Sequence, residues 1–178
     1  LEILLSAESS GRESRRVKTA LRLSNLPTGQ TLANFDFAFQ PAIERSRIET
    51  LATCAWVRGA ETVLIQGPPG VGKTHLAVGL GMKAVEQGFS VQYFRFGELL
   101  NDLRGDAALP PAQLRRRKYL STALLVIDEL GFHPMNPQEA SLFFRLVTYR
   151  YGRGSILITT NKSVRDWKAM PAATFTHP

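Results

Sequence analysis

The sequence holds one cysteine, Cys54, among 178 residues. A single thiol excludes a disulfide within the chain and is typical of a protein from a reducing cytosol. The 3 histidines are scattered and show no metal-ligand spacing with Cys54, so we expect no zinc site. No apolar run approaches the ~20 residues that cross a bilayer, so we expect no membrane partner. These absences predict a cytoplasmic protein.

Acidic residues are also scarce relative to basic ones. The chain has 22 Lys and Arg against 15 Asp and Glu, a formal net charge of +7. This excess favours a polyanionic partner, nucleic acid above all, although a merely basic surface is an equal alternative. Hydrophobic residues make up 44% of the chain and charged residues 21%, which is typical of one globular domain with a substantial core.

Composition divides the chain into three parts. Residues 1–30 are polar and basic and are interpreted as an arm or linker, with a break at Pro27-Thr28-Gly29. Residues 31–168 carry the expected globular core, and residues 169–178 form a divergent tail. The opening run Leu1–Leu5 is too short and too acidic for a signal peptide, and a start at leucine is expected either of a fragment or of an incompletely defined reading frame.

Within the core, apolar runs alternate with helical patterns. Strands are expected at Thr62–Gln66, which should be buried, and at Ser90–Phe96, Ala123–Ile127 and Ser155–Thr160. Helices are expected at Pro41–Arg58, Lys73–Gln87, Glu98–Arg104 and from Pro137 to Gly152. Gly79 and Gly81 interrupt the second helix and predict close packing against the sheet. The alternation predicts an α/β fold of three layers with a mostly parallel sheet.

The most informative segment is Gly67-Pro68-Pro69-Gly70-Val71-Gly72-Lys73-Thr74, between an expected strand and an expected helix. The spacing G-x-x-x-x-G-K-[ST] in this setting is the phosphate-binding P-loop. Its glycines let backbone N–H groups surround phosphate oxygens at a helix N-terminus, where peptide dipoles favour negative charge. Lys73 is expected to contact the β- and γ-phosphates, and the Thr74 hydroxyl to ligate Mg²⁺. A nucleoside triphosphate is the predicted ligand.

Three polar residues follow the later apolar strands. Asp128 and Glu129 come directly after Ala123–Ile127, and Asn161 ends the next strand. Open α/β sheets bind ligands at the carboxyl ends of their strands. We expect Asp128 to bind Mg²⁺, the Walker B role, and Glu129 to orient or deprotonate the attacking water. Asn161 is placed to bond the γ-phosphate or that water, although asparagine also favours strand-ending turns.

Other residues indicate which nucleotide base is bound and which part of the surface could contact DNA. A GTPase guanine motif would need aspartate where Val164 stands, so ATP is favoured over GTP. Phe35, Phe37 and Phe39 are candidates to flank adenine, with a core role as the alternative. Arg115–Lys118 is the densest basic cluster, and it is either a DNA contact or a solvated helix face.

Five segments together resemble the IstB family, the ATP-binding helper proteins of insertion-sequence transposons. That family is similar to the DnaC-like helicase loaders within the AAA+ class. The segments are Leu26-Pro27, Phe35-Asp36-Phe37, Gly67 through Ala77, Val126 through Gly131, and Thr159-Thr160-Asn161. The P-loop and the Asp-Glu pair are generic to many ATPases, whereas the full string from Phe35 to Trp167 is specific to this group. The resemblance covers residues 21–167.

The resemblance implies an Mg²⁺-dependent ATPase that assembles on double-stranded DNA as a homo-oligomer and assists a transposase. In the family, a basic surface and the N-terminal region engage DNA and transposase, and the stretch before Pro41 lies near adenine. The ATP-binding run extends from Gly67 through His75. The family pattern gives catalytic roles to Lys73, Thr74 (with Mg²⁺), Asp128 (Walker B), Glu129 (catalytic glutamate) and Asn161 (sensor 1).

The chain departs from the family pattern at its end. Family members continue with a fifth strand and a helical lid whose arginines act on ATP between subunits, whereas this chain stops at Pro178. Thr62–Gln66 is then expected to be an exposed apolar edge strand. Arg165, the one arginine after Asn161, is not expected to act as an arginine finger. Such a finger contributes about 10³–10⁵ in rate, so we expect a truncated chain with impaired hydrolysis of its own.

Three functions stay open at this point. The first is an ATPase helper of transposition, and the second is a DnaC-like loader of a replicative helicase. The third is an ATP-responsive DNA-binding module without turnover, because the lid and the finger are missing. The partner, transposase or helicase, distinguishes the first two, and an ATPase assay distinguishes the third.

Overall fold

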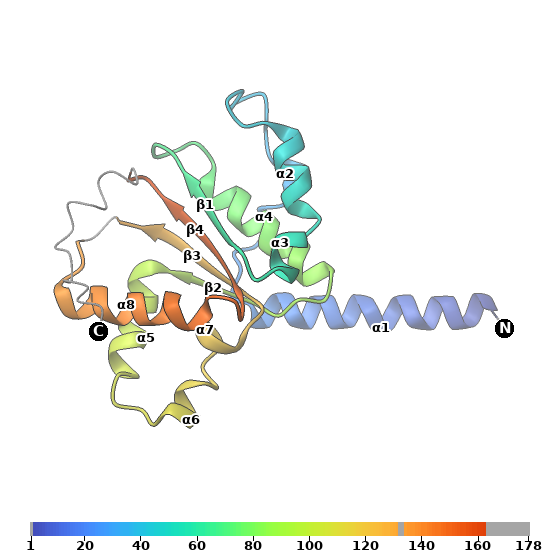
Figure 1. Cartoon of the computed structure of the whole chain (residues 1–178). Coiled ribbons are helices and arrows are strands. Elements are labelled where there is room, and N and C mark those ends of the chain that lie inside the picture. Colours follow the sequence, from blue (N-terminus) through green and yellow to red (C-terminus); the bar gives the residue numbers. More distant parts are fainter. Residues whose placement is uncertain (1, 132–133, 163–178) are drawn as a thin grey trace.

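The chain folds around a four-stranded parallel sheet with the strand order β1-β4-β3-β2 (Figure 1). The strands are β1 (Thr62–Gln66), β2 (Val91–Arg95), β3 (Leu124–Leu130) and β4 (Ser155–Thr160). The computed structural model describes residues 2–131 and 134–162, with side chains from residue 11 onward. Val164, Arg165 and the predicted tail 169–178 lie outside the described residues. The predicted α/β fold with a parallel sheet is confirmed.

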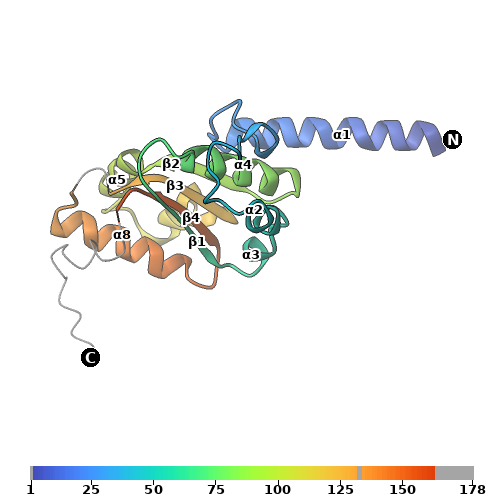
Figure 2. The ribbon, with the colours of Figure 1, turned by 90° about the horizontal axis from the view of Figure 1, so that it is seen from above.

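Helices cover both faces of this sheet (Figure 2). They are α1 (Glu2–Leu23), η1 (Leu32–Asn34), α2 (Arg45–Ala52), α3 (Ala55–Arg58), α4 (Lys73–Glu86), α5 (Phe96–Gly105), α6 (Pro111–Leu114), α7 (Lys118–Ser121) and α8 (Pro137–Arg150). α4 packs on one face, α5 and α8 pack on the other, and α1 lies on the α4 side and projects beyond the sheet (Figures 1 and 2). Within the described part of the chain, no helix is long and apolar enough to cross a membrane.

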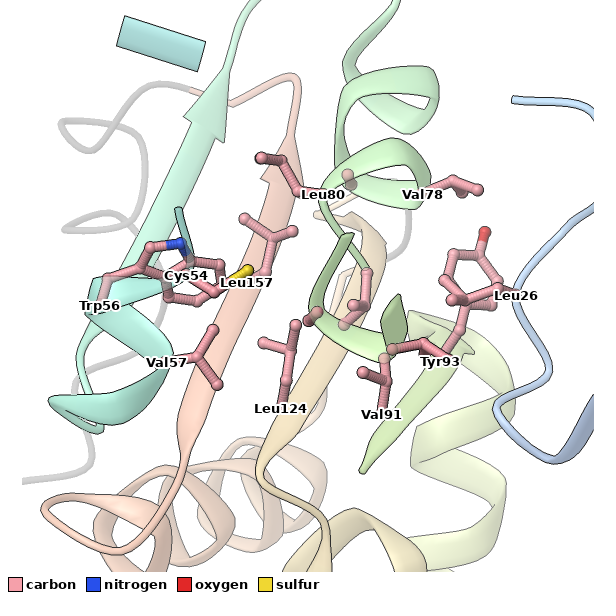
Figure 3. Close-up of a cluster of buried hydrophobic side chains, with 14 residues drawn as sticks. Leu26, Cys54, Trp56, Val57, Val78, Leu80, Val91, Tyr93, Leu124 and Leu157 are labelled. Atoms are coloured by element: carbon pink, nitrogen blue, oxygen red, sulfur yellow. The ribbon is translucent and has the colours of Figure 1, made fainter. Parts of the chain in front are cut away.

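Each face of the sheet has its own apolar core. Along β3, Leu124 and Val126 point to the α4 side, where they join Leu157 in the cluster drawn in Figure 3. Leu125 and Ile127 point to the opposite side and join the cluster under α5 and α8. Side chains alternate in this way along any strand, and both sets are apolar here because helices cover both faces.

The segment between Pro41 and Arg58 differs from its prediction as one helix. It forms two helices, α2 and α3, separated at Cys54, whose backbone is left-handed with φ 57°. Pro41 lies in a turn ahead of α2 and not in a first helical turn. The break lets Cys54 and Trp56 both enter the core on the α4 side (Figure 3).

The end of the predicted arm 1–30 packs into the core. Leu21 and Leu26 pack against the α4-side cluster. The Ser24 carbonyl accepts the Tyr93 N–H at 2.8 Å, so this segment also lies along the outer edge of β2. The interpretation as an arm therefore fits only the part of α1 that projects (Figure 1).

Gly79 and Gly81 of α4 pack closely, but not against the sheet as the sequence predicts. A Cβ on Gly79 would come within 2.7 Å of the Leu32 side chain, and one on Gly81 within 2.9 Å of Leu26. The sheet residue Val126 lies at an ordinary 3.6 Å from that second position. The two glycines therefore let the N-terminal segment, and not the sheet, approach the helix that follows the phosphate loop.

β1 forms an edge of the sheet and pairs with β4. Its side chains alternate between exposed and half-buried positions, and Leu64 is 39% exposed. The prediction of a buried strand is therefore wrong, and the prediction of an exposed apolar edge is confirmed for the described chain. The reason is that α2 stands beside this edge without covering it (Figure 1).

α8 begins and ends at well-defined contacts. Asn136 and Glu139 form a capping box at its start. At its end, Arg150 is 1% exposed and donates to the carbonyls of Tyr119, Thr122, Ala123 and Ser155. Burial lowers the pKa of Arg150 to about 10, so the side chain is still a cation at neutral pH. This arginine ties α8 to the chain entering β3 and β4.

Candidate nucleotide-binding site

The loop between β1 and α4 has the backbone curl that phosphate binding requires. Gly70 and Gly72 have φ of 81° and 83°, in the left-handed region that favours glycine. A Cβ on Gly72 would also come within 2.7 Å of the Phe35 ring. α4 begins at Lys73, with Gly72 as its N-cap, so the unpaired N–H groups of its first turn lie at the loop. The loop and the helix start together form an anion-binding site.

Lys73 folds back over this loop. Its Nζ donates to the Pro68 carbonyl at 2.6 Å. Burial lowers the pKa of Lys73, and the nearby Asp128 carboxylate opposes this shift with a smaller effect. The ammonium group therefore lies where phosphate oxygens bound in the loop would replace the carbonyl as its partner.

The Asp128 carboxylate is the centre of the site. It is 1% exposed and accepts hydrogen bonds from three hydroxyl groups. Thr74 Oγ1 lies 3.0 Å from both carboxylate oxygens, the Tyr93 hydroxyl donates to Oδ2 at 2.7 Å, and Thr159 Oγ1 donates to Oδ1. Hydrogen bonds to an ionised acceptor are stronger than neutral ones, and three of them hold this carboxylate in one orientation.

Tyr93 is the part of this arrangement that sequence reasoning missed. It lies on β2, next to β3, the strand that carries Asp128, and its ring is buried in the α4-side core. Burial raises the pKa of Tyr93, and its bond to Asp128 raises it further. The hydroxyl therefore stays protonated and acts as a donor. The sequence signal was a tyrosine near the end of a strand, which becomes informative only once the strand order is known.

Glu129, next to Asp128, lies where β3 is irregular. The pairing of β3 with β4 shifts register between Ile127 and Leu130, and Glu129 has a left-handed φ of 63°. Its N–H donates to Thr159 Oγ1 at 2.9 Å, and its side chain is exposed. A left-handed conformation is costly for a residue with a side chain and tends to occur at functional sites. One carboxylate of the pair is therefore buried in the fold, and the next is exposed to solvent.

Arg95 lies beside these carboxylates. It pairs with Asp128 in the β2–β3 register. Its pKa is raised by a hydrogen bond with the Tyr93 side chain and by the negative charge of Glu129. The exposed glutamate therefore has a cation from the neighbouring strand nearby, which sequence spacing alone could not reveal.

Asn161 follows β4 and carries an unusual polar atom. Its Oδ1 is buried and has no hydrogen-bond partner among residues 2–131 and 134–162. Buried polar atoms are nearly always paired, so this acceptor lacks a donor that a ligand or water can supply. Since β4 lies between β1 and β3, Asn161 comes from the strand end between the phosphate loop and Asp128.

The aromatic segment before α2 packs against the phosphate loop. Phe35 is buried, makes edge contacts with Phe37 at 4.8 Å and His75 at 5.2 Å between ring centroids, and touches Gly72. Phe39 is 70% exposed. Phe35 therefore has the core role that was the alternative to an adenine contact, and its ring packs against the phosphate loop.

His75, predicted to end the ATP-binding run, makes its described bonds away from the loop. Its Nε2 lies 2.8 Å from the Thr31 carbonyl and 2.9 Å from Asn34 Oδ1. These bonds tie the first turn of α4 to η1. The position supports the phosphate loop through its neighbours, and no described contact of His75 reaches the loop glycines.

A groove of about 850 Å³ opens beside the loop. α2 lines one side, and the exposed β1 edge lines the other, with Ile43, Val63, Val71 and Lys73 among its residues. This volume lies in the range of small-molecule sites, which are mostly apolar with a few polar groups. The groove joins an apolar wall to the phosphate-binding lysine.

The strand order brings most of the predicted residues together. The ends of β1, β4 and β3 are adjacent, so the loop 67–74, Asn161 and Asp128 meet at one edge. Thr74 and Asp128, 54 positions apart, are in direct contact. Their oxygens are the ligand type that Mg²⁺ prefers, and Mg²⁺ sites commonly use one or two protein ligands with phosphate and water. The residues present therefore fit Mg²⁺ bound together with a triphosphate.

Comparison with known proteins agrees with this geometry. A family model described as IstB-like ATP binding protein matches residues 1–175. The IS21 putative ATP-binding protein of Pseudomonas aeruginosa is 45% identical over 168 residues, which cover 93% of this chain and 63% of the relative. The IS5376 putative ATP-binding protein of Geobacillus stearothermophilus is 35% identical, over 92% of this chain and 65% of the relative. The chain spans less than two thirds of the length of both relatives.

Solved structures agree on the fold. The crystal structure of the DnaC helicase loader superposes with a TM-score of 0.62 at 25% identity, covering 84% of this chain and 86% of that chain. AMPPCP-bound DnaA from Aquifex aeolicus has a TM-score of 0.62 at 21% identity, covering 82% and 49%, and supports the fold alone. The fold is the AAA+ P-loop fold, and the family match supports ATP as ligand. By sequence and by fold, the chain belongs to the family of IstB-like ATP-binding proteins.

Proposed function

We propose that this chain binds ATP with Mg²⁺ and hydrolyses it as a helper of DNA transposition. The single observation that carries the proposal is the contact between Thr74 of the phosphate loop and the buried Asp128 carboxylate. This contact joins two candidate Mg²⁺ ligands beside a lysine-bearing anion site. The family match supports ATP as the nucleotide.

The protein groups divide the chemistry among them. Lys73 and the loop N–H groups hold the β- and γ-phosphates, and Thr74 and Asp128 hold Mg²⁺, which would neutralise charge on those phosphates. Glu129, exposed beside Asp128, orients a water for attack on the γ-phosphorus and accepts its proton, while the bond to the bridging oxygen breaks and ADP leaves. Asn161 Oδ1 is placed to accept a hydrogen bond from that water.

The partners follow from relatives and charge. The named relatives are proteins of insertion sequences, which supports a transposase as partner. The net charge of +7 supports double-stranded DNA, on which the chain assembles as a homo-oligomer. The likeness to DnaC favours a second candidate, loading of a replicative helicase. Copurification with a transposase supports the first candidate, and copurification with a helicase supports the second.

An ATPase assay with and without double-stranded DNA tests the proposal, with Glu129→Gln as comparison. We expect activity that DNA stimulates and that the variant reduces at least tenfold while still binding ATP, because only the water-activating group is changed. ATP binding without turnover, in both proteins, would replace this proposal by that of an ATP-responsive binding module.

A further inference from the structure

A second polar cavity lies at the opposite edge of the sheet from the phosphate loop. It has a volume of about 390 Å³ and borders the β2 edge, α5 and the loop that enters α7. We call it the Gln92 pocket and define it by Gln92, Phe94, Asp102, Arg116, Arg117 and Lys118. Two strands, β4 and β3, separate β2 from β1, which leads into the phosphate loop, so the two sites are distinct.

Gln92 marks this pocket as a binding site. Its side chain is 1% exposed, and its Oε1 has no hydrogen-bond partner among the described residues. Its Nε2 makes a long 3.4 Å bond to the carbonyl of Tyr93. Leaving a buried acceptor unpaired is costly, so a native structure that does so needs an explanation. Gln92 Oε1 therefore has room for a hydrogen bond from an N–H or O–H group of a ligand.

The rim of the pocket carries an excess of positive charge, which favours an anionic ligand. Arg116, Arg117 and Lys118 outnumber the carboxylates of Asp102 and Asp106. Asp106 is already occupied, since it accepts bonds from Arg117 and from the hydroxyl of Tyr119. The Arg116 side chain is exposed and has no ion pair or hydrogen bond in the described part of the chain. The ligand must therefore carry both a hydrogen-bond donor and a negative group.

An unpaired nucleotide meets both requirements. Each base carries an N–H on its pairing edge, and in a duplex that group is already bonded to the opposite base. Phe94, on the same face of β2 as Gln92, adds a half-buried aromatic ring. Single-stranded nucleic acid is commonly bound by a basic groove with aromatic side chains. Lys118 also bonds the carbonyl of Leu23 at 3.1 Å, which brings the basic end of α1 to the same rim.

We propose that the Gln92 pocket binds one unpaired nucleotide of a DNA strand, with the base donating an N–H to Gln92 Oε1 and a phosphate on Arg116. The proposal deepens the DNA association of the proposed function, on which it rests, and does not depend on the phosphate loop. It predicts that the chain prefers locally opened DNA to a perfect duplex.

The test is the affinity of the Lys73→Ala chain, without ATP, for two fluorescent single-stranded oligonucleotides of equal length. One oligonucleotide has ordinary bases and the other has abasic sites throughout. The Lys73→Ala background removes the phosphate loop as an alternative site. Gln92→Leu is compared with Arg116→Ala and with the control Arg58→Ala, an exposed arginine of α3 outside the pocket.

Gln92→Leu should weaken binding of the ordinary strand about tenfold and leave the abasic strand unchanged, because only the base contact is removed. Arg116→Ala should weaken both strands, and Arg58→Ala neither. Urea unfolding controls for folding, since leucine removes an unpaired buried acceptor and should leave the protein as stable as its parent or more so.

Several outcomes overturn the proposal. If Gln92→Leu bound the ordinary and the abasic strand with the same affinities as its parent, the pocket would hold only water and no base. If Gln92→Leu weakened the binding of a perfect duplex as much as that of the ordinary single strand, the assignment to an unpaired base would be overturned. If free dAMP competed with the same affinity as the oligonucleotide, the assignment to a nucleotide within a strand would be overturned. No binding of any DNA by the parent would instead contradict the DNA part of the proposed function.

Discussion

The Asp128 carboxylate carries most of the site's chemistry at the scale of single residues. It is buried, yet hydroxyls from α4, β2 and β4 donate to it. The fold therefore holds one carboxylate rigidly at the place where a cation would bind, and it leaves the adjacent Glu129 free to meet water. The two neighbouring acids have different environments, and this difference is consistent with the different roles proposed for them.

Replacing Tyr93 by phenylalanine tests how firmly Asp128 is held. The change removes the hydroxyl that donates at 2.7 Å and keeps the buried ring. We expect the free energy of unfolding to fall by about 1.5–3 kcal/mol, the contribution of a hydrogen bond to a charged group. Urea denaturation measures this change. Tyr151→Phe, at an 87% exposed tyrosine, is the matched control and should have no effect. Equal stability of the two variants would contradict the assigned bond.

Alanine at Gly72 tests the close packing behind the phosphate loop. A Cβ there meets the Phe35 ring and the backbone is left-handed, so we expect a loss of about 1–3 kcal/mol in stability and weaker ATP binding. Adding Phe35→Leu should recover part of the stability by removing the collision. Gly97→Ala in α5, where a Cβ meets nothing within 4 Å, should instead stabilise by up to about 1 kcal/mol. If Gly72→Ala and Gly97→Ala changed the stability in the same way, the predicted collision with Phe35 would be contradicted.

At the scale of elements, the register of the parallel strands builds the site. Thr74, Tyr93, Asp128 and Thr159 come from four elements, and they meet because the strands end together. Arg150 contributes from the other end of the sheet, since it binds carbonyls of the chain entering β3 and β4.

Leucine at Arg150 tests this clamp. The variant keeps apolar volume but leaves several buried carbonyls without donors, so we expect a loss of about 2–4 kcal/mol in unfolding free energy. The loss is limited because burying the cation is itself costly, as its lowered pKa indicates. Thermal and urea unfolding measure the change. Arg145→Leu, on the exposed side of α8, is the control and should be nearly neutral. If Arg150→Leu were as stable as Arg145→Leu, the claim that the Arg150 hydrogen bonds stabilise the fold would be contradicted.

The elements also mark how far the sequence could predict the structure. Apolar runs bounded by turn residues predicted β4 without error, and the helix expected from Pro137 has its observed start there. The split between α2 and α3 was missed, because the helical spacing continues through Cys54 while its backbone turns left-handed. Tyr93 was missed because its partner Asp128 comes from another strand, and the Gln92 pocket was missed because a strand, a helix and a loop together line it.

At the scale of the whole molecule, charge and shape both favour a long polyanion. The net charge is +7, and α1 projects from the body on the α4 side (Figure 2). α1 carries the exposed cations Arg15 and Arg22 and ends beside Lys118. One set of basic residues therefore lies on the projecting helix, and another lies on the rim of the Gln92 pocket.

DNA affinity should fall steeply with salt. Each phosphate neutralised by lysine or arginine releases a counterion, so log affinity against log salt should be linear with a slope of about −0.9 per contact. Fluorescence anisotropy at a series of salt concentrations measures the slope. Arg22→Ala should reduce its magnitude by about 1 if this residue contacts a phosphate. An affinity independent of salt would contradict electrostatic binding.

The central claim is that the loop at Gly67–Thr74 and the Asp128 carboxylate form one ATP–Mg²⁺ site. Calorimetric titration of ATP into the chain, with Mg²⁺ and then with EDTA, tests it most directly, in the parent and in Lys73→Ala. The account predicts binding that is tighter with Mg²⁺ and lost in Lys73→Ala, because the lysine contacts phosphates and Thr74 with Asp128 hold the cation. ATP affinity that is unchanged by the substitution and by removal of Mg²⁺ would contradict it.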